Sequence, residues 1–221
     1  MDDTPVVMVV DRYGRAAAIA ALVVTLAWHL GNDLPATLTG WSGYERPAVV
    51  GGVWLGYLLL ALVFGIAAVR GRGYHWSLAL LTTPLLLGGA WLVHEADGTG
   101  SPFAAPDWAW GAAGWFALLV LWRRHLAELV AFCLANATLT AITLVHIGQA
   151  DRIEVSRFMM VGYGVSVLPV TVFVGGRVLA RTAGRAAQTA DDQARVDTAR
   201  LAAEVVHQAR GARFRSARQA S

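Results

Sequence analysis

The chain has 221 residues, of which 56% are hydrophobic and only 15% are charged, and its formal net charge is +3. A soluble domain carries about one quarter charged residues, so the apolar surplus predicts that lipid forms part of the solvent. All 18 basic residues are arginine, which excludes chemistry that needs a lysine amine, such as a retinal or pyridoxal Schiff base. The single cysteine, Cys133, excludes an internal disulfide framework and a cysteine-based zinc site.

Six apolar runs are long enough, or nearly so, to cross a bilayer, because a helical span needs about 20 mainly apolar residues. They cover residues 16–34, 47–69, 76–94, 104–122, 126–147 and 158–179. The fourth is the weakest because its apolar stretch is short, and a five-span topology is the alternative. The sequence therefore predicts an all-α fold, a helical membrane bundle of about six spans in residues 1–180, followed by a cytoplasmic helix in residues 181–221.

Arginines mark alternate ends of these runs. They precede the first span and follow the second, fourth and sixth, as expected for a cytoplasmic N-terminus and six crossings. These arginines are Arg12, Arg15, Arg70, Arg72, Arg123, Arg124, Arg177, Arg181 and Arg185. The opposite loops are mainly acidic, although Arg152 and Arg157 in the last loop break the pattern. We predict a multi-pass protein of the cell membrane with both termini in the cytoplasm.

Three histidines, His29, His94 and His146, fall near the predicted outer ends of spans one, three and five. Three imidazoles at one depth match the donors of a transition-metal or haem site, which is one hypothesis. A second is that each is an interface histidine with its ring at headgroup level, and a third is pH sensing. Apart from the haem or metal hypothesis, the sequence predicts no cofactor.

The fifth span carries a second polar feature. Asn136, Thr140 and Thr143 share one helical face, which is expected to point inward and bind another helix by hydrogen bonds. The functional alternative is a small polar cavity for a ligand. Glu128 lies four residues after Arg124, a spacing that predicts an intrahelical ion pair, with a proton-relay carboxylate as the alternative.

Prolines interrupt two of the predicted spans. Pro84 lies in span three and Pro169 in span six, and each is expected to kink its helix. Glycines flank Pro169 on both sides, which suits either a bendable span or close packing through small residues. Span six leads directly into the tail, so a bend there would suit a signalling helix.

The tail after residue 181 is rich in alanine and arginine. Apolar residues recur at four- and seven-residue steps, which places one thin apolar stripe on a helix. The stripe comprises Ala190, Ala194, Leu201, Val205 and Ala212. Such a helix buries too little to be stable alone, so we predict a homodimer through the tail; the alternatives are a solvated basic tail and a tail that binds anionic lipid.

Three segments carry a family resemblance: DRYGR at residues 11–15, HLAEL at 125–129 and RLAAEVVH at 200–207. With the multi-span layout, they resemble the membrane-spanning input half of actinobacterial sensor histidine kinases and of their ATP-binding relatives. The resemblance implies a signal-transduction module, a cytoplasmic response regulator as partner, and His207 as the candidate phosphate acceptor. The 221 residues hold no complete catalytic motif, so whether the chain is an enzyme is left open. We expect no nucleic-acid partner. The alternative function is a small-molecule, metal- or haem-binding membrane protein of a transporter-like kind.

Overall fold

A computed structural model describes residues 5–70, 76–98, 102–103, 107–148 and 150–219. Its elements are α1 (Pro5–Trp28), the π-helical turn η1 (His29–Asp33), α2 (Leu34–Thr39), α3 (Pro47–Val69), α4 (Trp76–Asp97), α5 (Trp108–Leu121), α6 (Leu126–His146), α7 (Arg152–Gly162), a second π-helical turn η2 (Tyr163–Val167), and α8 (Leu168–Gln219). The described residues include no β-strand, so the all-α prediction is confirmed.

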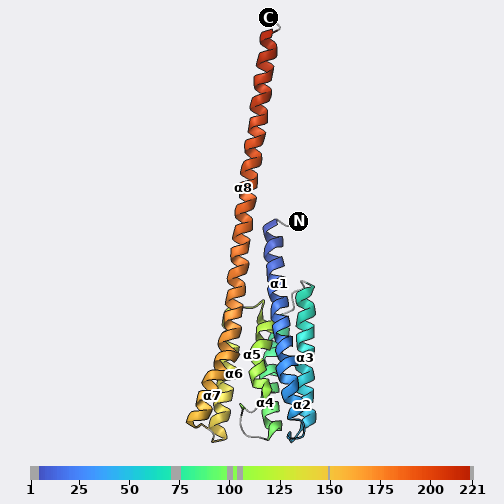
Figure 1. Cartoon of the computed structure of the whole chain (residues 1–221), viewed down its shortest axis with the longest axis vertical. Coiled ribbons are helices and arrows are strands. Elements are labelled where there is room, and N and C mark those ends of the chain that lie inside the picture. Colours follow the sequence, from blue (N-terminus) through green and yellow to red (C-terminus); the bar gives the residue numbers. More distant parts are fainter. Residues whose placement is uncertain (1–4, 71–75, 99–101, 104–106, 149, 220–221) are drawn as a thin grey trace. The chain divides into compact units, whose positions relative to one another are not determined.

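Contacts divide the chain into two units, which we describe separately. One is Gly14–Val178, a helical bundle, and the other joins Met1–Tyr13 and Leu179–Ser221. Within the bundle, α1, α4 and α6 run in one direction while α3, α5 and α8 run in the other (Figure 1). Each helix is therefore antiparallel to the next, as short connections require.

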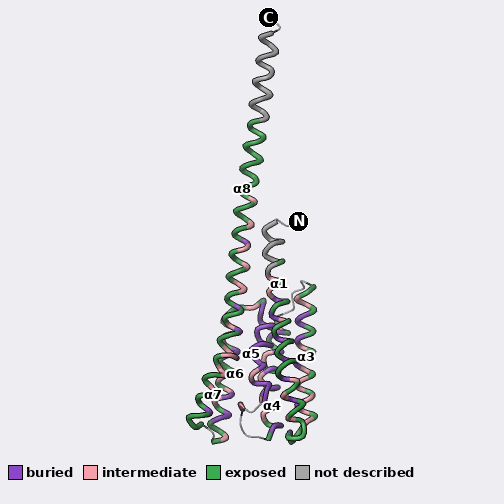
Figure 2. Tube along the Cα trace, in the orientation of Figure 1, coloured by how far each residue is buried: buried purple, intermediate pink, exposed green. Residues whose placement is uncertain are grey.

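The outward faces of the bundle are apolar. Leu59 of α3 is 61% exposed, Leu85 of α4 62% and Leu134 of α6 63%, and Figure 2 shows exposed residues along the outer sides of α1 and α3. Soluble monomers rarely leave such continuous apolar surface in water. Five helices in the described residues are long and apolar enough to cross a membrane, which supports the prediction of a multi-pass protein.

The remaining apolar helix, α5, is the core of the bundle. Its 14 residues span about 21 Å at about 1.5 Å per residue, which is less than the hydrocarbon thickness. Yet 13 of the 14 are buried, and α5 contacts α3, α4, α6, η1 and η2. The fourth predicted span was short because this helix is surrounded by protein, and its length need not match the bilayer.

Both π-helical turns end at a Leu-Pro pair. In η1 the N–H of Leu34 donates to the carbonyl of His29 before Pro35, and in η2 the N–H of Leu168 donates to Tyr163 before Pro169. Proline has no N–H, so the usual i→i−4 bond is missing at each site, and the wider π turn accommodates the loss. The first turn carries the buried residues His29 and Asp33, and the second carries the buried residue Val165.

Helix α8 comprises 52 residues, of which residues 168–178 belong to the bundle and the rest to the other unit. The predicted helix after span six is thus present. Val196 and Leu201 on its later part are 48% and 64% exposed. At Val205, His207 and Ala212 the structure describes the helical backbone but not the side chains.

Candidate polar site at one end of the bundle

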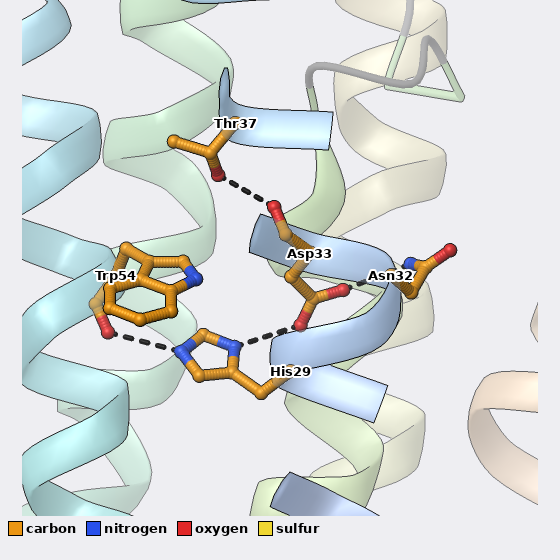
Figure 3. Close-up of polar contacts among 5 residues, drawn as sticks. All are labelled: His29, Asn32, Asp33, Thr37 and Trp54. Atoms are coloured by element: carbon orange, nitrogen blue, oxygen red, sulfur yellow. Dashed lines mark hydrogen bonds and ion pairs between the residues drawn. The ribbon is translucent and has the colours of Figure 1, made fainter. Parts of the chain in front are cut away.

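A histidine–carboxylate pair lies fully buried in the first helix. The η1 turn places His29 and Asp33 four residues apart, and neither side chain is exposed. His29 Nδ1 lies 2.9 Å from Asp33 Oδ2, and His29 Nε2 lies 3.1 Å from the carbonyl oxygen of Trp54 on α3 (Figure 3). A carbonyl only accepts, so Nε2 carries a hydrogen, and one further proton lies between Nδ1 and Oδ2.

Aromatic rings enclose this pair. The His29 ring stacks on Trp54 with centroids 4.8 Å apart, and Phe116 of α5 meets it edge-on at 5.0 Å. Asn32 donates from Nδ2 to Asp33 Oδ1 at 3.0 Å, and Thr37 donates to the backbone carbonyl of Asp33 at 2.7 Å (Figure 3). Both carboxylate oxygens of Asp33 and both imidazole nitrogens of His29 are thus engaged.

A second pair joins α4 to α5. His94 Nδ1 lies 2.7 Å from Asp107 Oδ2, and the Asp107 side chain is only 1% exposed. Asp107 occupies the N-cap position of α5 without capping it through its side chain. Burial raises the pKa of Asp107 from 3.8 to about 6, while the hydrogen bond from His94 lowers it and the nearby charge of Asp97 raises it.

The raised pKa of Asp107 predicts a pH-dependent stability. The folded protein holds this proton more tightly than the unfolded chain, so ionisation of Asp107 destabilises the fold. Its contribution favours folding most below about pH 4 and declines as the pH rises through about 6. Melting temperatures measured between about pH 4 and pH 7 should therefore fall more in the parent protein than in Asp107→Asn, and parallel curves would contradict this assignment.

The polar face predicted on span five is buried against α5. Asn136 donates from Nδ2 to the carbonyl of Trp110 at 3.3 Å, while Thr140 and Thr143 donate to the carbonyls of Asn136 and Leu139 in their own helix at 3.0 Å. A small cavity of about 20 Å³ lies between α4, α5 and α6, lined by His94, Asp107, Thr140 and Thr143 among others. Asn136 therefore links two helices, while the two threonines border a cavity.

The three histidines of the metal hypothesis have different surroundings. His29 and His94 are each paired with a carboxylate, and His146 is exposed at the end of α6. Among the described residues, no group of three or more His, Cys, Asp or Glu side chains is placed to hold a metal ion. Metal or haem binding stays a prediction from the sequence, as does the phosphate-acceptor role of His207.

The opposite end of the bundle is fastened by an arginine. Arg177 Nη2 donates to the carbonyls of Trp122 and Arg124 at 3.0 and 2.8 Å, where α5 ends and α6 begins. Its guanidinium lies 4.9 Å from the centroid of the Phe173 ring. In the sequence, Arg177 indicated only the orientation of span six, and no local pattern predicted that it joins α8 to this connection. The expected ion pair between Arg124 and Glu128 is present, with Nε of the arginine 2.9 Å from Oε2 of the glutamate.

No protein-family model, curated protein or solved structure matches this chain. The fold and the polar site define a class, a helical membrane bundle with two histidine–carboxylate pairs at one end, of which His29–Asp33 is fully buried.

Proposed function

We propose that this chain is a membrane-embedded signal input module, similar in layout to the N-terminal part of a two-component sensor kinase. The observation that carries the proposal is the continuity of α8, whose first turns contact Trp122 at the end of α5 through Phe173 and Arg177, while the same helix runs on to Gln219. In this proposal, packing changes at the polar end act on the first turns of α8, and the tail follows them in the same helical element.

The proposed orientation places the arginine-bearing connections and both termini in the cytoplasm of a cell-membrane protein. The two histidine–carboxylate pairs then lie toward the outside, where an extracytoplasmic cue has access. Ionisable groups buried within a membrane protein usually mark function, because their burial is unfavourable. A second copy of the chain and a response regulator are the proposed partners of the tail.

Cysteine crosslinking tests the dimeric tail. In full-length protein carrying Cys133→Ala, we expect Leu201→Cys to crosslink between copies in native membranes, because Leu201 lies on the apolar stripe and is 64% exposed. Ala203→Cys is the matched control, since it lies about 200° around the same helix. We expect several-fold more crosslinked dimer for Leu201→Cys than for Ala203→Cys. No crosslink at Leu201, or equal crosslinking at both positions, would overturn the dimeric arrangement.

A further inference from the structure

The cavity between α4, α5 and α6 has the size of one small molecule. Its volume of about 20 Å³ is enough for one water-sized species. Its wall combines the His94–Asp107 pair with two indole rings, Trp91 and Trp110, and two hydroxyls of α6. Asp107 and Trp110 are 4% and 5% exposed, so these two polar side chains of the wall are buried.

Hydrogen-bond acceptors predominate around this cavity. Thr140 and Thr143 already donate their hydroxyl protons to carbonyls of α6, so each oxygen offers only lone pairs to the cavity. Among the residues that the structure describes, Asp107 Oδ1 has no hydrogen-bond partner. Among the described residues that line the cavity, one buried donor, the indole Nε1 of Trp110, lacks a hydrogen-bond partner. A ligand with several donors fits this set better than a water molecule with two.

Charge favours a cation at the same place. Asp107 contributes a carboxylate, and Asp97 adds negative potential there. Indole faces such as those of Trp91 and Trp110 attract cations. A buried carboxylate oxygen without a partner is unfavourable, so a cation that donates to it would stabilise the folded protein.

We propose that this cavity binds ammonium. Ammonium is close to water in size, and its four N–H donors include enough for the Asp107 carboxylate and the hydroxyl oxygens of Thr140 and Thr143. His94 donates from Nδ1 to the other oxygen of Asp107, so a proton on His94 and an ammonium ion compete to neutralise one carboxylate. Binding should consequently weaken as the pH falls. The site itself does not depend on the proposed signalling role; only the step from bound ammonium to an external cue rests on it.

Thermal unfolding of the full-length protein in detergent tests this site, since a ligand that binds only the folded state raises the melting temperature. At constant ionic strength and neutral pH, ammonium chloride should raise the melting temperature more than potassium, sodium or tetramethylammonium chloride. Potassium has a similar charge and size but no N–H group, and tetramethylammonium is cationic without donors. Equal stabilisation by potassium and ammonium would show that no donor-specific site exists, and would overturn the proposal.

Two variants locate the effect. Thr143→Val keeps the side-chain shape and the His94–Asp107 pair, and should raise the half-saturating ammonium concentration about tenfold, the loss expected for one hydrogen bond to a charged group. Asp107→Asn should abolish the effect, and the exposed Glu95→Gln at the same end should leave it unchanged. If Thr143→Val and Glu95→Gln behave alike, the cavity is not the site. This result is independent of tail crosslinking, so either proposal can fail while the other stands.

Discussion

Replacing Asp33 by alanine is expected to destabilise the bundle by about 3–5 kcal/mol, the scale of loss when one partner of a buried pair is removed and the other is left without it. His29 would keep its bond from Nε2 to the Trp54 carbonyl but would lose the acceptor or donor at Nδ1. Its ring is unexposed and surrounded by aromatic rings, so no solvent is available to compensate. Reversible unfolding in mixed micelles, followed by tryptophan fluorescence, measures the difference in free energy of unfolding.

A double substitution separates an unpaired polar group from a simple loss of packing. His29→Phe with Asp33→Leu removes both polar partners and keeps apolar bulk among Trp54, Trp108 and Phe116. Apolar replacement of a whole buried pair is often neutral or stabilising, so the double variant should recover most of the stability lost in Asp33→Ala. The exposed carboxylate variant Glu95→Gln should stay within about 0.5 kcal/mol of the parent. A double variant as unstable as Asp33→Ala would show that the pair acts through its shape rather than its polarity.

The helices could be predicted from the sequence because long apolar runs leave few other structures in lipid. The residues 47–69 predicted for span two are the bounds of α3, and residues 126–147 differ from α6 by one residue. The fourth span was harder to predict. In the structure, 13 residues of α5 are buried inside the bundle. An apolar run in a sequence has the same composition whether lipid or protein surrounds it.

The polar site was only partly visible in the sequence. His29 and Asp33 are four residues apart, so local helical spacing already brought them together. His94 and Asp107 are 13 residues apart and lie on either side of a connection, so helical spacing does not predict that they form a pair. The two π turns likewise depend on the missing N–H of Pro35 and Pro169. In the sequence, the feature that could have predicted these turns is the Leu-Pro pair that follows each of them.

A backbone contact between α5 and η2 gives the second large effect. Pro169 has no N–H to donate to the carbonyl of Val165, and this carbonyl points at Gly114 of α5, where a Cβ would collide with Val165 O and lie 3.0 Å from the carbonyl carbon. Gly114→Ala is therefore expected to destabilise the protein by about 3 kcal/mol, the upper end for overpacking, because backbone atoms cannot rotate away as a side chain can.

Gly111, three residues earlier in the same helix, is the matched control because a Cβ there meets no atom within 4 Å. Gly111→Ala should be neutral or stabilising by up to about 1 kcal/mol, since alanine favours the helix. Adding Pro169→Ala to Gly114→Ala returns an N–H that can draw the Val165 carbonyl back into the helix, and should restore part of the stability. Equal unfolding free energies for Gly114→Ala and Gly111→Ala would contradict the close contact. If the contact holds, partial rescue by Pro169→Ala would show that the missing proline N–H is what turns the Val165 carbonyl toward α5.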